Sequence, residues 1–111
     1  MQKDDLVYVG HMLDKAREAV DLVKGKDRSD YNSEPAIRYA LAHLLQIIGE
    51  AARRISQDFC KSHPEIPWKA LVGMRHKVVH DYTSVDEDVV WDTVQQELPP
   101  LIKSLERIVN G

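Results

Sequence analysis

The chain has 111 residues, a net charge of −3 and a composition that is 43% hydrophobic and 30% charged, so its length predicts one domain spanning 1–111. This composition can bury a core, and it excludes collagen-like, low-complexity and largely disordered chains. No apolar run approaches the roughly 18 residues that a membrane span needs, and the first residues lack the order of a secretory signal. The single cysteine, Cys60, cannot close a disulfide within the chain and suits a reducing compartment. We therefore expect a cytoplasmic domain with no membrane partner.

The first predicted element is an amphipathic helix that ends near Gly25. Its apolar residues recur in steps of three and four, which is the spacing of one helical face. They are Leu6, Val9, Leu13, Ala16, Val20 and Val23. The polar stretch 26–32 then predicts a loop.

The second predicted helix is long and central. Ser33 offers an N-cap, and Pro35 suits the first turn, where its missing N–H is harmless. The same stepping then runs without a break, which predicts one helix over 37–59. Its stripe consists of Ile37, Leu41, Leu44, Ile48, Ala51, Ile55 and Phe59. Additional apolar residues beside this stripe indicate contacts with more than one neighbouring helix.

Two prolines within 63–67 interrupt the pattern, and Pro67 then suits the first turn of a third helix, which we expect to continue towards His80. A turn is expected over 81–85. Asp86 can cap a fourth helix, because its side chain can accept from the first turn.

The stripe of this last helix passes Pro99 and Pro100 in register, which predicts one kinked helix or two pieces end to end. It consists of Trp91, Val94, Leu98, Leu101, Leu105 and Ile108. Trp68 and Trp91 are expected to be core or interface anchors. No segment alternates with period two, so we expect no strands. The predicted fold class is all-α, an antiparallel bundle of four to five helices.

Charge is unevenly distributed along the chain. Residues 50–80 carry six Lys or Arg and three Asp or Glu, a net +3, whereas residues 81–111 carry two and seven, a net −5. The middle segment could therefore meet an anion such as phosphate, and the last segment a basic partner. An ordinary solvated surface explains the same distribution equally well.

The residues best suited to chemistry lie in the run 75–82, Arg-His-Lys-Val-Val-His-Asp-Tyr. Histidine can take or give a proton near neutral pH. Arginine stays charged and can hold two phosphate oxygens at once. Arg75 and His80 are the candidate pair for phosphodiester chemistry.

The spacing of these residues leaves alternatives open. On an ideal helix Arg75 and His80 are about 140° apart, so they converge only if the helix frays at His80, if Arg75 curls round, or if a second subunit completes the site. A competing interpretation pairs His76 with His80, which at i and i+4 could share a face and chelate a metal. Lys77 between them would repel a cation, so no metal site is predicted.

The run from Arg75 to Tyr82, an arginine, four residues, a histidine, one residue and a tyrosine, resembles the motif of HepT-like toxins of the HEPN superfamily. Supporting segments are 48–51 (Ile-Gly-Glu-Ala), 63–68 (His-Pro-Glu-Ile-Pro-Trp), Val-Trp at 90–91 and Leu-Pro-Pro-Leu at 98–101. Together they cover nearly the whole chain in the family's order.

The resemblance implies a helical homodimer and a metal-independent endoribonuclease without a cofactor. Arg75 and His80 would line an RNA-binding cleft at the subunit interface, as the catalytic residues. It also implies a partner, an MntA-like nucleotidyltransferase antitoxin that transfers AMP from ATP to Tyr82. An adenylate there would add bulk and negative charge where substrate phosphate must bind.

Three further residues are candidates for auxiliary roles. Many relatives carry Asn where this chain has His76, so His76 could replace that donor or shift the pKa of His80 by repulsion. Lys77 could touch substrate phosphate, or be a solvated lysine. Glu50 could bond Arg75 or orient His80, although an ordinary boundary carboxylate is the more common outcome. The alternative function is a non-catalytic helical partner of a nucleotidyltransferase, which would need neither Arg75 nor His80.

Overall fold

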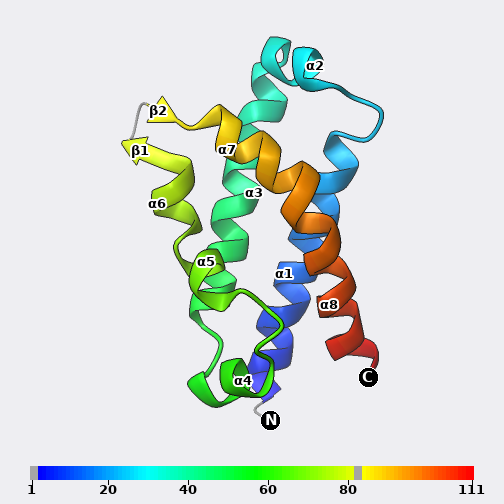
Figure 1. Cartoon of the computed structure of the whole chain (residues 1–111), viewed down its shortest axis with the longest axis vertical. Coiled ribbons are helices and arrows are strands. Elements are labelled where there is room, and N and C mark those ends of the chain that lie inside the picture. Colours follow the sequence, from blue (N-terminus) through cyan, green and yellow to red (C-terminus); the bar gives the residue numbers. More distant parts are fainter. Residues whose placement is uncertain (1–2, 82–83) are drawn as a thin grey trace.

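The computed structural model describes residues 3–81 and 84–111 (Figure 1). Its elements, in chain order, are α1 (Lys3–Leu22), α2 (Arg28–Ser33), α3 (Pro35–Arg53), α4 (Gln57–Ser62), α5 (Trp68–Val72), α6 (Met74–Val78), β1 (Val79–Asp81), β2 (Ser84–Val85), α7 (Glu87–Asp92), the π-helix η1 (Thr93–Glu97) and α8 (Leu98–Asn110). Most of the described chain is therefore helical.

The helices form an antiparallel bundle, as the sequence predicts. In Figure 1 α1 runs up from the N-terminus, α3 runs down, α5 and α6 run up, and α7 leads down into α8. α3 is the central element, because it packs against α1 on one side and against α5 and α6 on the other, while α8 packs on α1. The short helices α2 and α4 lie at opposite ends of the bundle (Figure 1).

The predicted stripe of α1 forms most of its buried face. Val9, Leu13 and Ala16 are buried as expected, and Met12 and Ala19 join them. The prediction that Leu6 belongs to this buried stripe is wrong, because 41% of the residue is exposed. The helix is followed by Gly25, whose φ of +77° is a left-handed conformation that glycine adopts at helix ends.

The loop predicted over 26–32 is wrong, because α2 forms there. Asp27 caps this helix in a reciprocal box: its carboxylate accepts from the Asp30 N–H, and the Asp30 carboxylate accepts from the Asp27 N–H. The helix is also held by Tyr31, which is fully buried and donates its hydroxyl proton to Glu87 at 2.6 Å. Burial, assisted by Glu87, raises the pKa of Tyr31. Ser33 therefore ends α2 and does not cap α3, whose N-cap is Glu34.

The single helix predicted over 37–59 is also divided. α3 ends at Arg53, and Ser56 starts α4 by accepting from the Phe59 N–H at 3.2 Å. Asp5, buried in α1, accepts from both the N–H and the hydroxyl of Ser56, at 2.8 and 2.7 Å. These bonds replace the helical ones at the break. Ile55 and Phe59 nevertheless remain buried, which is why the apolar stepping gave no sign of a break.

The third predicted helix is shorter than expected and the expectation of no strands is wrong. α5 and α6 are separated by Gly73, and after Val78 the chain enters β1. β1 pairs antiparallel with β2, with Val79 opposite Val85. The sequence predicts a helix up to His80 and a turn over 81–85 in this part of the chain.

The last part of the chain follows the prediction closely. Asp86 caps α7 by accepting from the Val89 N–H at 3.2 Å. Val94, Leu98, Leu101 and Leu105 are buried, whereas Ile108 at the end of the stripe is only partly buried. The wider π-helical turn η1 lies directly before the two prolines at the start of α8. α7, η1 and α8 are thus the end-to-end pieces that the stripe allowed. Along residues 3–81 and 84–111, no helix combines the length and apolarity needed to cross a membrane.

Close packing of α3 against α5 depends on Gly49. A Cβ atom added at this buried glycine would lie 2.7 Å from the Leu71 carbonyl oxygen and 3.3 Å from the Cβ of Met74. The first contact is with backbone, which cannot rotate away, so any side chain here must push the two helices apart.

We predict that Gly49→Ala destabilises the protein by about 1–3 kcal/mol, because the added methyl group overpacks this contact. Gly10→Ala is the matched control, since a Cβ at that helical position of α1 meets nothing within 4 Å. It should instead stabilise the protein by roughly 0.5–1 kcal/mol, the helix-propensity gain. Urea unfolding followed by circular dichroism measures both, and equal effects of the two substitutions would contradict the close approach.

Candidate functional site

The three basic residues of the motif are displayed by α6. Met74 and Val78, four residues apart, are buried and hold this helix against α3 and α7. The opposite face is therefore turned to solvent, and Arg75, His76 and Lys77 are all exposed there. Burial of one face thus determines the exposure of the basic one.

Arg75 is available to an anionic ligand as far as the described residues show. Among the side chains described in residues 3–81 and 84–111, no carboxylate forms an ion pair with Arg75. Lys77 is 3.9 Å from Glu97 through Nζ and Oε2, which is too long for a hydrogen bond. A guanidinium in this position can pair with two phosphate oxygens without first breaking an ion pair.

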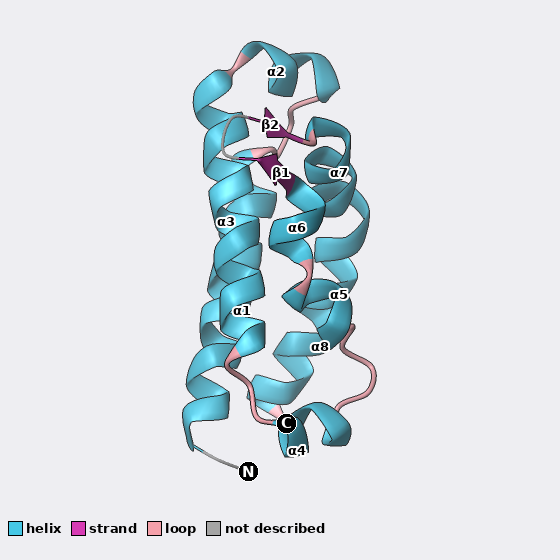
Figure 2. Cartoon of the chain, turned by 90° about the vertical axis from the view of Figure 1, so that its left-hand side faces the viewer, coloured by secondary structure: helices cyan, strands magenta, loops and turns pink. Residues whose placement is uncertain are grey.

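The backbone leaves helical geometry between Arg75 and His80. α6 ends at Val78, and Val79 has φ −113° and ψ 112°, an extended conformation. The Asp86 N–H donates to the Val78 carbonyl at 2.7 Å, which joins the end of α6 to the start of α7. Figure 2 shows β1 and β2 at this end of α6.

This extended backbone affects two expectations that assumed a continuous helix, the separation of Arg75 from His80 and the pairing of His76 with His80. The 140° separation of Arg75 and His80 assumed one continuous helix, and His80 instead stands on β1. The chelating pair of His76 and His80 assumed the same helix, so their shared face does not form. The side chains of His80 and Asp81, and the whole of Tyr82, lie outside the described residues, so the structure does not bring Arg75 and His80 together or separate them.

Within the described residues, no hydrogen bond or ion pair links Glu50 to the 75–82 motif. It is exposed on α3, and its recorded ionic neighbour is Arg53, with Oε1 3.9 Å from Nη1. The structure thus places Glu50 as an exposed carboxylate. Within residues 3–81 and 84–111, no group of three or more His, Cys, Asp or Glu side chains is arranged to hold a metal ion.

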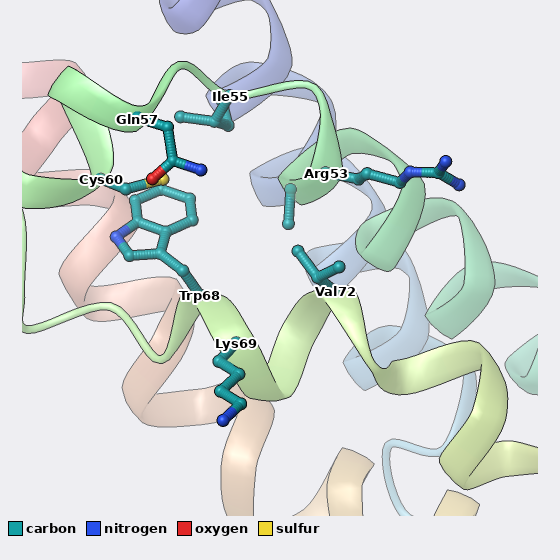
Figure 3. A pocket seen from close by; sticks show the side chains of 8 residues that line it. Arg53, Ile55, Gln57, Cys60, Trp68, Lys69 and Val72 are labelled. Atoms are coloured by element: carbon teal, nitrogen blue, oxygen red, sulfur yellow. The ribbon is translucent and has the colours of Figure 1, made fainter.

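A second feature is an open pocket of about 420 Å³ between the end of α3, α4 and α5 (Figure 3). It is lined by Ala52, Arg53, Ile55, Gln57, Cys60, Trp68, Lys69 and Val72. Trp68 is half-buried, with its Nε1–H donated to the His63 carbonyl at 2.9 Å and its ring in edge contact with Phe59. These contacts confirm the anchoring role predicted for Trp68. The pocket beside it has no counterpart in the sequence pattern.

Cys60 contributes its thiol to this pocket. Burial, with a smaller contribution from the Asp5 carboxylate, raises the pKa of the thiol. A raised pKa keeps the group protonated and weakly nucleophilic at neutral pH. Cys60 therefore lines the pocket wall with a thiol whose surroundings disfavour the thiolate.

Comparisons with known proteins identify the family. The model of the family described as ribonuclease HepT-like matches residues 12–108. A candidate RNase of Caldanaerobacter subterraneus subsp. tengcongensis is 33% identical over 103 residues, covering 93% of this chain and 92% of that protein. A candidate RNase of Methanocaldococcus jannaschii is 33% identical over 109 residues, covering 98% and 94%. A candidate ribonuclease HepT of Thermococcus cleftensis is 36% identical over 100 residues, covering 86% and 91%.

No solved structure matches the chain at a significant level. The family match spans α6 and β1, which carry Arg75 and His80, and extends over most of the bundle. The chain therefore belongs to the HepT-like ribonuclease family.

Proposed function

We propose that this chain is the toxin of a toxin–antitoxin pair and cleaves RNA without a metal ion, through Arg75 and His80 at a cleft between two copies of the chain. Family membership supports RNA as the substrate. The observation that carries the proposal is an exposed Arg75 without a recorded carboxylate partner among the described residues, on a helix that ends before His80.

The proposed reaction uses the 2′-hydroxyl that distinguishes RNA from DNA. His80 takes the proton of that hydroxyl as the 2′-oxygen forms a bond to the adjacent phosphorus. The bond from phosphorus to the 5′-oxygen of the next nucleotide breaks, and this oxygen takes a proton from water. Protonated His80 then gives its proton to the hydroxide that remains, which returns His80 to its starting state. Arg75 stabilises the negative charge that grows on the phosphorane oxygens. The products are a 2′,3′-cyclic phosphate and a 5′-hydroxyl end.

Two nearby residues are proposed to assist. His76 and Lys77 are exposed on the same short helix as Arg75, so each could donate to a phosphate oxygen of bound RNA. Their expected contribution is smaller than that of Arg75, because contacts away from the reacting phosphate position the substrate without stabilising the transition state.

Control of the toxin is proposed to act at Tyr82. An MntA-like nucleotidyltransferase would join the phenol oxygen of Tyr82 to the α-phosphorus of ATP, with release of pyrophosphate. The phenol is neutral at pH 7, so the partner enzyme must supply the base that takes its proton and the metal that holds ATP. The adenylate would then stand two residues from His80 and repel the phosphates of RNA.

We predict that Arg75→Gln lowers RNA cleavage by about 10²–10³-fold, because one transition-state donor is lost. His80→Ala should lower cleavage by about 10²–10⁴-fold, the usual contribution of a general acid or base. A fluorogenic RNA assay on purified protein measures both, and EDTA should leave the wild-type rate unchanged.

The matched control is His11→Ala, which removes an exposed histidine of α1 far along the chain from the motif. This variant should cleave RNA like the wild type. Loss of activity with EDTA and its return with added metal would contradict the proposed mechanism. A folded wild-type protein with neither RNA cleavage nor growth arrest would favour the non-catalytic partner of a nucleotidyltransferase.

A separate prediction concerns Tyr82→Phe, which removes the phenol oxygen that would accept AMP. Cells that express this variant should stop growing even when the antitoxin is present, because the toxin can no longer be modified. Intact-mass spectrometry after incubation with the antitoxin and ATP should show added AMP on the wild type and none on the variant. A Tyr82→Phe protein that is still adenylylated and silenced would refute this assignment.

A further inference from the structure

The pocket between α3, α4 and α5 offers a flat aromatic surface that is already held in place. The Trp68 indole is fixed by its bond to the His63 carbonyl and by its contact with Phe59. Val72, 41% exposed, follows Trp68 by one helical turn on α5 and lines the same pocket (Figure 3). A fixed aromatic ring beside an exposed apolar side chain is a stacking site for a planar ligand, and it loses little side-chain entropy when the ligand binds.

Two cations stand at the rim of the same pocket. The Arg53 side chain is 71% exposed, and its recorded carboxylate neighbour, Glu50, is 3.9 Å away. Lys69 is exposed and has no recorded ion-pair partner among the residues that the structure describes. Figure 3 shows both side chains directed outward from the pocket, in different directions. They are therefore placed to meet negative charge outside the pocket and not within it.

We propose that this pocket takes one unstacked base of single-stranded RNA, with the flanking phosphates at Arg53 and Lys69. A base stacked on the indole beside Val72 would leave its sugar and phosphates at the rim, where the two cations stand. Aromatic platforms flanked by basic side chains are the usual means by which proteins bind single strands. This inference rests on the proposed function, since the occupant is the RNA that Arg75 and His80 are proposed to cleave.

Continuity with α6 favours RNA over a peptide as the occupant. Lys69 and Val72 belong to α5, which contacts α6 and precedes it by one residue. In Figure 2 α5 and α6 follow each other along one side of the bundle, and Arg75 belongs to α6. Residues 50–80, which contain both places, carry the net +3 charge noted above.

The test uses a 12-nucleotide single-stranded RNA with 2′-O-methyl groups, which blocks cleavage through the 2′-oxygen. Binding is followed by fluorescence anisotropy of a 5′ label at several salt concentrations. The double variant Arg53→Gln and Lys69→Gln should bind roughly tenfold more weakly at 0.1 M salt. Its slope of log affinity against log salt should be shallower by about 1.4, because two phosphate contacts are lost at about 0.7 each.

The matched control removes the same charge from α8, which contributes no residue to the pocket, by Lys103→Gln and Arg107→Gln. This double variant should keep the wild-type affinity and salt slope. Because the four substituted side chains are exposed, both variants should fold.

Occupation of the pocket by a base is tested by tryptophan fluorescence with the unlabelled RNA. The RNA should quench the emission, whereas inorganic polyphosphate of equal charge should not. Trp68→Phe should remove the response while RNA still binds, and Val72→Glu should weaken binding roughly tenfold by placing a carboxylate at the pocket.

An unchanged affinity and salt slope in the Arg53 and Lys69 double variant would overturn the inference, as would the same quenching by polyphosphate. Failure of the inference is distinct from failure of the proposed function. Wild-type cleavage that depends on Arg75 and His80, without any effect of the pocket, removes the inference alone. Pocket-dependent binding without cleavage removes the proposed reaction alone.

Discussion

The change from helix to strand after Val78 is the constraint on which the candidate site depends. Burial of Met74 and Val78 holds α6 on the bundle, and the bond from the Asp86 N–H to the Val78 carbonyl ties its end to α7. Pairing of β1 with β2 then takes Val79 and His80 out of helical geometry. A continuous helix would have turned Arg75 and His80 to different faces, so the end of α6 removes an obstacle to the joint action that we propose for them.

The same constraint links the site to the centre of the bundle. Both α5 and α6 pack on α3, and they approach it closely at Gly49, where a Cβ atom would meet the Leu71 carbonyl oxygen and the Cβ of Met74. This close approach also brings Trp68 and Val72 to the end of α3 and so forms the pocket beside Arg53. A buried glycine, an exposed basic helix and an aromatic pocket are thus consequences of one packing arrangement.

Apolar spacing predicted the bundle and its main buried faces, because spacing records which side of a helix meets the core. It could not predict the break after Arg53, since Ile55 and Phe59 stay in register while Asp5, distant in sequence, caps Ser56. It could not predict β1 either, because a strand of this length needs its partner β2. The prediction of Arg75 as a site residue rests on its residue type and motif, whereas the pocket joins three segments and has no local signal.

The most direct test of this account is the conformation of residues 75–86 in solution, measured by NMR on the labelled protein. We predict helical Cα shifts through Val78, extended shifts at Val79 and His80, and cross-strand nuclear Overhauser effects between Val79 and Val85. The Asp86 amide proton should exchange slowly, because it is bonded to the Val78 carbonyl. Helical shifts that continue through His80, with a rapidly exchanging Asp86 amide, would contradict it.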